Sequence, residues 1–132
     1  AVTQYVGMGG VGAAAPTLGL GPPVAPEVGC WRYNGPTPFE VIRAGDGLSS
    51  TILNAETNAD LGPWIAGGNP TVRPFLTGPD AKPPVGVGGQ FGGNHPGFVH
   101  FGFADGSVRW MRDGINPAVM RSLVTIAGGD QD

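Results

Sequence analysis

The chain has one cysteine and two histidines among 132 residues. A single cysteine cannot close a disulfide within the chain and cannot build a cysteine zinc site. Cys30 is therefore expected to be a buried small hydrophobe, its commoner role, or a thiol that pairs between molecules. At this length one apolar core can form without disulfide or metal staples, so we expect a single domain over residues 1–132.

Charged residues are also scarce, at 13% of the chain, and Lys82 is the sole lysine. Because no basic stripe is present to neutralise phosphates, we expect no nucleic-acid partner. No apolar run reaches the roughly 18 residues that a membrane span needs, and the start of the sequence does not read as a signal peptide. Together with the abundance of glycine and proline, these features favour a processed, secreted chain with an extracellular or cell-surface location.

Glycine and proline are abundant, at 25 and 14 residues, which in an unpatterned chain suggests disorder. Here the apolar share of 40% and the presence of 3 Trp indicate instead a packed domain with long, turn-rich loops. The expected fold class is α+β: a small antiparallel β-sheet, a C-terminal helix packed on it, and long Gly/Pro-rich loops.

The clearest local signal is a β-hairpin around Asp105-Gly106. This dipeptide between two β-rich runs favours a type I′ turn, because both central residues need positive φ. A two-residue loop places Phe101 opposite Trp110. The alternation of side chains then predicts a core face of Val99, Phe101, Phe103, Val108 and Trp110, and an opposite face of Phe98, His100, Gly102, Ala104, Ser107, Arg109 and Met111.

A helix is predicted from Pro117 to about Ala127, ending at Gly128 or Gly129. Asn116 is suited to be its N-cap, and proline is favoured at the first helical position. The apolar stripe should cover the aromatic face of the hairpin. The residues of that stripe are Val119, Met120, Leu123 and Val124.

Other segments carry weaker signals. The ranges 2–6 and 51–57 read as strands, residues 31–33 are compatible with a short one, and residues 62–75 read as an extended loop anchored by Trp64. Asp46 is expected to cap a single helical turn through Ser49 or to form an Asx-turn. Ser49 and Ser50 beside Asp46 invite a nucleophile hypothesis, but no histidine lies nearby in sequence, so capping is favoured.

Two further patterns raise the question of a cofactor or metal. Residues 7–12 formally match G-x-G-x-x-G, but the prolines that follow exclude the helix a dinucleotide site needs, so we expect a flexible glycine-rich loop and no cofactor. His95, His100 and Asp105 suggest a metal site or hydrolase. Because His95 and Asp105 should lie far apart along one strand, we expect no catalytic or metal residue here, with His95 hydrogen-bonding a turn and Asp105 setting turn conformation.

The spacing from His95 to Asp105-Gly106 resembles the H-X9-DG signature of the DUF1559 family, a group of pilin-like and pseudopilin-like proteins abundant in planctomycetes. Residues 45–53 are similar to that family's Asp-Gly-x-Ser-Asn-Thr-Ile motif, with Ser50 in place of Asn. Residues 5–7, 62–64 and 125–129 are similar as well. The structural motif residues that the resemblance marks are His95, Asp105, Gly106, Asp46 and Gly47.

The resemblance implies a pilin-like globular domain. Family members normally begin with a prepilin cleavage site and a long apolar helix, and the sequence given shows neither, so we expect the globular part alone. The implied function is a non-enzymatic structural subunit that self-assembles into a filament or surface appendage. Candidate self-association residues are Val2, Tyr5, Val6, His100, Arg109 and Trp64. The alternative is a surface-displayed glycan- or peptide-binding module with an aromatic platform of Trp31, Tyr33, Trp64 and Phe75.

Overall fold

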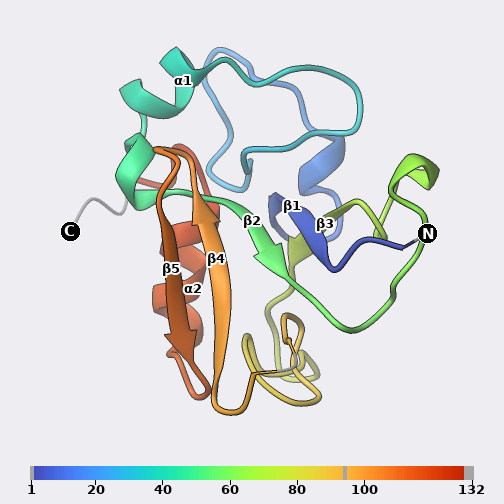
Figure 1. Ribbon diagram of the computed structural model, residues 1–132. Coiled ribbons are helices and arrows are strands. Elements are labelled where there is room, and N and C mark those ends of the chain that lie inside the picture. The colour runs from blue at the N-terminus through green and yellow to red at the C-terminus, as the bar shows by residue number, and fades with distance from the viewer. Residues whose placement is uncertain (1, 94, 130–132) are drawn as a thin grey trace.

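The computed structural model describes residues 2–93 and 95–129. Its centre is a five-stranded sheet with the strand order β3-β1-β2-β4-β5 (Figure 1). The predicted α+β class is confirmed, but the sheet is mixed rather than antiparallel, because β1 runs parallel to β3. The strands are β1 (Tyr5–Val11), β2 (Ile52–Glu56), β3 (Val72–Phe75), β4 (Phe98–Phe103) and β5 (Val108–Arg112).

The described helices are short. α1 spans Phe39–Ala44, and α2 spans Pro117–Val124. Single 3-10 turns lie at η1 (Ala15–Thr17), η2 (Leu48–Ser50) and η3 (Trp64–Ala66). Residues 31–33, proposed as a short strand, contribute only an isolated bridge between Arg32 and Gly35.

The glycine-rich stretch of residues 7–11 belongs to β1, an inner strand of the sheet, which corrects the prediction of a flexible loop. Gly10 has φ +98°, and a Cβ there would lie 2.1 Å from the carbonyl oxygen of Glu27. Glycine therefore lets two backbones approach, a need unrelated to phosphate binding. Only the three-residue turn η1 follows β1, so the helix of a dinucleotide site does not form at this G-x-G-x-x-G match.

The hairpin of β4 and β5 is confirmed, but its predicted register is wrong by one residue. Phe101 pairs with Arg109 rather than with Trp110. The loop holds residues 104–106, because the Phe103 N–H donates to the Ser107 carbonyl and Gly106 takes φ +88°. This is the three-residue loop with glycine in the left-handed position. The shift turns Val108 and Trp110 away from the core, leaving them 69% and 56% exposed.

Helix α2 starts as predicted, with the Asn116 side-chain oxygen accepting the Ala118 N–H at 2.8 Å. It ends at Val124 rather than near Ala127, because Ile126 joins other segments: its N–H donates to Val28 and its carbonyl accepts from Asp46. Figure 1 shows α2 on one side of the sheet, where it contacts mainly β1 and β2. Val119 of the predicted stripe is exposed, and Trp110 is not covered.

Two clusters of buried side chains form the core. The larger lies between the sheet and α2 and includes Val6, Met8, Phe101, Phe103, Met120 and Val124. The smaller includes Val28, Cys30, Ile42, Ala104 and Ile126. Cys30 is buried, and this burial raises the pKa of its thiol to about 12.

Candidate functional site

The face of the sheet away from α2 gathers the polar residues of four strands. In the observed registers Tyr5 pairs with Glu56, Asn54 with Gly102, and His100 with Trp110. Paired residues point to the same side of a sheet, and so do alternate residues of one strand. We call this side the outer face; it carries Tyr5, Gly7, Asn54, Glu56, His100, Gly102, Val108 and Trp110.

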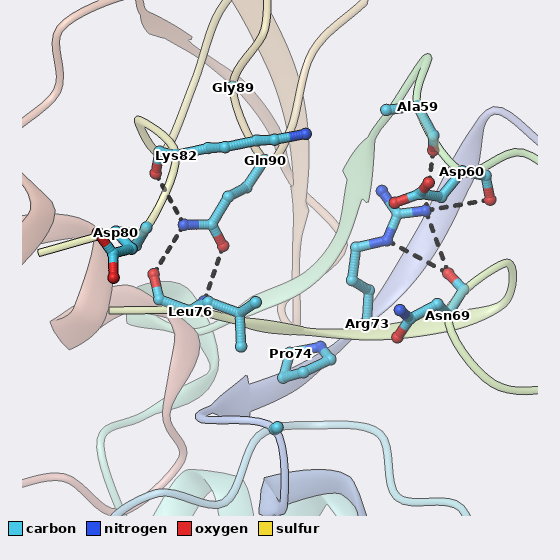
Figure 2. Close-up of a pocket in the computed structure, with 12 residues that line it drawn as sticks. Ala59, Asp60, Asn69, Arg73, Pro74, Leu76, Asp80, Lys82, Gly89 and Gln90 are labelled. Carbon is cyan, nitrogen blue, oxygen red and sulfur yellow. Dashed lines mark hydrogen bonds between the residues drawn. The ribbon is translucent and has the colours of Figure 1, made fainter. Parts of the chain in front are cut away.

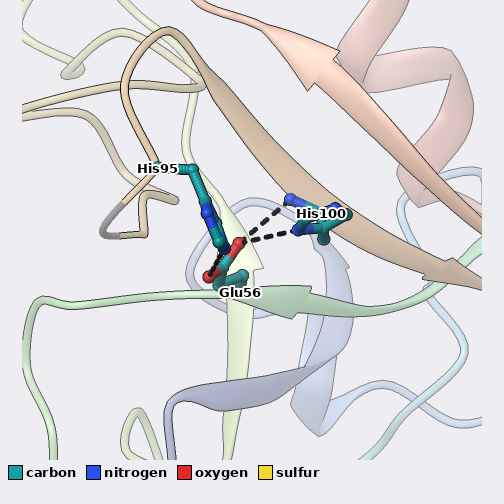
Figure 3. Close-up of side chains that lie close together, drawn as sticks. All are labelled: Glu56, His95 and His100. Atoms are coloured by element: carbon teal, nitrogen blue, oxygen red, sulfur yellow. Dashed lines mark hydrogen bonds and ion pairs between the residues drawn. The ribbon is translucent and has the colours of Figure 1, made fainter.

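Glu56, His95 and His100 meet on the outer face (Figure 3). The His95 Nε2 lies 3.4 Å from Glu56 Oε1, and the His100 Nδ1 lies 3.5 Å from Glu56 Oε2. The Glu56 side chain is only 11% exposed, whereas His95 and His100 are 45% and 32% exposed. One buried carboxylate thus stands between two imidazoles that open to solvent; we call these three residues the His-Glu cluster.

The backbone around Glu56 holds its carboxylate in place. Glu56 Oε2 also accepts the backbone N–H of His100 at 3.1 Å, and the Asn54 Oδ1 accepts that of Gly102 at 3.2 Å. Two side chains of β2 therefore bind the β4 backbone. On the other side, a Cβ at Gly93 would lie 2.4 Å from Glu56 Oε1, so glycine is what allows the loop to lie against this carboxylate.

Aromatic contacts fix the His95 ring. It stacks on Phe98 with ring centroids 5.1 Å apart and planes 14° apart, and it meets the His100 ring edge-on at 5.0 Å. Phe98 in turn contacts Trp110 at 6.0 Å. A row of rings thus links the His-Glu cluster to the exposed side chain of Trp110.

The sequence reasoning paired His95 and His100 with Asp105 and missed Glu56. In the structure the His95 Nε2 lies 3.4 Å from Glu56 Oε1 of β2, in place of the hydrogen bond to a turn that the sequence suggested. Glu56 was recognised only as part of a strand, because nothing in the local sequence says that β2 and β4 are neighbours. A glutamate that alternates with Asn54 on a mostly apolar strand was the one available signal.

Asp105 sits in the hairpin loop at the far end of β4. Its Oδ1 accepts both the N–H and the hydroxyl of Ser107, at 2.9 and 2.6 Å. These hydrogen bonds lower the pKa of the Asp105 carboxyl below its usual range, and Arg109 at 3.9 Å adds a smaller effect. Asp105 therefore orders the loop and takes no part in the His-Glu cluster.

Asp46 does not cap a helical turn, which corrects that prediction. Its carboxylate accepts the N–H groups of Gly128 and Gly129 at 2.8 and 3.2 Å. The η2 turn has Gly47 at its N-cap position with φ +93° and receives no side-chain cap. Asp46 therefore ties the segment after α2 to the loop before β2, and its carboxylate is directed at backbone amides rather than at a serine.

A concavity with mixed polar and apolar lining lies around Arg73 (Figure 2). The guanidinium of Arg73 donates to the carbonyls of Ala59, Asp60 and Asn69 and to the Thr57 hydroxyl. Burial lowers the pKa of Arg73, and the Asp60 carboxylate opposes this shift. Because the guanidinium N–H groups are already bound by carbonyls of this chain, Arg73 stabilises the surrounding loops.

The residues predicted for self-association fall into different environments. Val2, Tyr5 and Trp64 are exposed, but Val6 is buried in the core. Tyr5 and Val6 belong to β1, which lies between β3 and β2, so their backbone is not open to an added strand. Arg109 also departs from expectation: its guanidinium lies 4.2 Å from the Phe103 ring and donates to the Ser49 carbonyl, away from His100.

The aromatic platform of the alternative hypothesis is incomplete. Phe75 is 1% exposed and belongs to the core, so it cannot stack on a ligand. Trp31 lies close to Gly7, where a Cβ would be 2.6 Å from its indole. Trp31 and Tyr33 are 47% and 41% exposed, and the Tyr33 hydroxyl lies 3.5 Å from the Val72 carbonyl, so each ring is partly packed and partly open to solvent.

Comparison with known proteins adds a family. A family model described as "Protein of unknown function (DUF1559)" matches residues 3–118. The chain belongs to the DUF1559 family. Searches of curated proteins and of solved structures found no match. In this DUF1559 chain, the segment from His95 to Asp105-Gly106 lies within the matched range and spans all of β4. Among the described residues, no helix combines the length and apolar character that crossing a bilayer requires.

Proposed function

We propose that this chain is a non-enzymatic structural subunit of an extracellular, pilin-like or pseudopilin-like assembly, and that it associates with copies of itself. The observation that carries the proposal is the uncovered apolar surface on β5. Val108 and Trp110 stand on the outer face of this strand with 69% and 56% of their surface exposed.

The position of β5 makes this surface suitable for association. Within the described sheet β5 ends the strand order, so β4 is its one neighbour and its other edge is open. An open edge offers backbone N–H and C=O groups to another chain. Further large apolar side chains lie exposed elsewhere, at Trp64 and Ile65. Side chains exposed singly are common on proteins, whereas neighbouring ones left uncovered on one strand, as Val108 and Trp110 are, mark an interaction surface.

The test is the oligomeric state across a concentration series. We expect the molar mass from light scattering to rise with concentration for the native chain, and electron microscopy to show ordered assemblies. The Trp110→Glu variant should remain monomeric, because a charge at the centre of an apolar contact stays unpaired when buried. Val87→Glu is the matched control, since Val87 is exposed but lies outside β5.

A native chain that stays monomeric at every concentration and forms no assembly would contradict the proposal. Equal association of the Trp110→Glu variant and the native chain would instead show that the interface does not include Trp110 of β5. Immunogold labelling of the source cells tests the extracellular location, which requires label outside the cell envelope.

A further inference from the structure

We propose that Glu56, His95 and His100 bind one divalent transition-metal ion of the zinc class on the outer face. This inference does not depend on the proposed structural function, and it replaces the expectation that the chain has no metal ligand. The three ligand atoms, two imidazole nitrogens and a carboxylate oxygen, all lie within 4.8 Å of one another.

The donor set selects the class of metal. Two imidazoles and one carboxylate match the ligands that Zn²⁺ and neighbouring first-row ions take in open sites. Ca²⁺ and Mg²⁺ prefer oxygen ligands alone, and they need more of them than one carboxylate supplies. A soft-metal thiolate site is not available here, because the sole cysteine, Cys30, is buried in the other cluster of the core.

The spacing of the donors fits a single small ion. With metal–ligand bonds of about 2.0–2.1 Å and tetrahedral angles, neighbouring ligands lie about 3.3–3.4 Å apart. The two imidazole nitrogens lie 3.4 and 3.5 Å from the Glu56 oxygens. The carboxylate and each imidazole thus already stand near the separation that a bound ion requires, with His95 beside Oε1 and His100 beside Oε2 of Glu56.

The surroundings fix the site before any ion arrives. Glu56 is held by the His100 N–H, and the His95 ring is held by stacking on Phe98. Ligands that are oriented by their neighbours lose little freedom when they bind a metal. The separations of these residues in sequence also mean that only the folded sheet brings the three donors together.

The exposure of the two histidines leaves room for further ligands. A shallow depression beside His100 is lined by Tyr5, Asn54, Gly102 and Val108. Three protein ligands with solvent access make an open coordination shell, in which water or an anionic group of a partner completes the site. The ion would therefore be accessible from the outer face.

The decisive measurement is a Zn²⁺ titration by isothermal calorimetry. The protein carries no polyhistidine tag and is first treated with EDTA and dialysed. We expect one Zn²⁺ per native chain, and Zn²⁺ should raise the melting temperature, because an ion that binds only the folded state stabilises it. Titration with Co²⁺ should produce the visible absorption of a nitrogen- and oxygen-ligated ion, whereas Ca²⁺ and Mg²⁺ should not compete.

Three variants assign the ligands. His95→Gln and His100→Gln should each weaken Zn²⁺ binding by at least about tenfold. Glu56→Gln keeps the size of the side chain and an oxygen that accepts the His100 N–H, but it loses the charge, and it should weaken binding similarly. Glu40→Gln is the matched control, because Glu40 is exposed on α1 and outside the cluster.

Circular dichroism of each variant separates loss of the site from loss of the fold. His95 is nearly half exposed, so His95→Gln should fold normally and remain informative even if Glu56→Gln does not. Absence of stoichiometric Zn²⁺ binding by the native chain would overturn the proposal. So would native affinity in the folded His95→Gln variant. These experiments use dilute protein, so their failure is independent of the self-association test.

Discussion

The two faces of β4 differ in burial, although the residues that form them alternate along one strand. Val99, Phe101 and Phe103 are buried against the rest of the core, whereas Phe98, His100 and Gly102 are partly open to solvent. The inner side chains contribute to stability by removing apolar surface from water. The outer side chains form the cluster and the aromatic row. The comparison teaches that stability and chemistry in this domain are divided between faces rather than between segments.

The largest expected difference is between two aromatic truncations. Phe101→Ala should lower the free energy of unfolding by about 3–5 kcal/mol, because it opens a cavity in the core. Trp110→Ala removes a larger ring from the outer face and should cost about 0.5–1 kcal/mol, since only its contacts with neighbouring rings are lost. Urea unfolding measures both values. Similar losses of unfolding free energy in the two variants would show that the two faces contribute equally to stability.

The next effect concerns the fit of the loop over Glu56. Gly93→Ala should destabilise the fold by about 1–3 kcal/mol, because the new Cβ overlaps the Glu56 carboxylate. The same change should weaken Zn²⁺ binding by displacing a ligand. Gly19→Ala is the control, since a Cβ there meets no atom within 4 Å and the residue has no positive φ. Unchanged stability and unchanged Zn²⁺ affinity in Gly93→Ala would show that the carboxylate is free to move.

A smaller effect is expected where β2 holds β4 through a side chain. Asn54→Ala removes the acceptor of the Gly102 N–H and should cost about 0.5–1.5 kcal/mol. Hydrogen exchange should show faster exchange of the Gly102 amide, while the Phe103 amide, which donates to the Ser107 carbonyl, keeps its protection. Asn54→Asp retains an acceptor and serves as the control. Unaltered exchange at Gly102 in Asn54→Ala would mean that this hydrogen bond does not hold the strand.

The smallest effect is at the hairpin loop, where Asp105 is exposed. Its pKa is lowered in the folded state by the Ser107 hydrogen bonds, so the stabilisation is present above the unfolded pKa and is lost as the pH falls through the folded one. In Ser107→Ala the pKa of Asp105 should rise toward its ordinary value. An NMR titration of the Asp105 carboxyl carbon measures this change. An unchanged titration would assign the shift to the Ser107 backbone N–H and Arg109 rather than to the hydroxyl.

Local sequence signals allowed prediction of the elements whose contacts are short in sequence, namely helix α2 and the β4–β5 hairpin. The Asn116-Pro117 pair marked the start of α2, and Asp105-Gly106 marked the hairpin. The hairpin register could not be predicted, because Asp-Gly serves both two-residue and three-residue loops. The start of β1 lies within the predicted strand of residues 2–6, but its continuation through residues 7–11 was missed, because glycine is unfavourable in strands unless a second backbone approaches, as that of residues 27–29 does here.

The candidate site depended on contacts between distant segments. Glu56 meets His95 and His100 only because β2 lies beside β4, and the order of strands is not written in any one segment. Asp46 likewise finds its partners at Gly128 and Gly129, which no local pattern indicates. Edge strand β3 was read as loop because Pro74 interrupts it, although proline is tolerated on an edge.

Cys30 shares a buried cluster with Ile126 of the segment after α2, and its thiol can report when this cluster opens. Ile126 is buried in the same cluster as Cys30, and its backbone is bonded to Val28 and Asp46. A buried thiol with a raised pKa reacts with alkylating agents only after it becomes exposed. The rate at which Cys30 is labelled under native conditions therefore measures how often this part of the core opens. Because the chain has one cysteine, the signal has a single source.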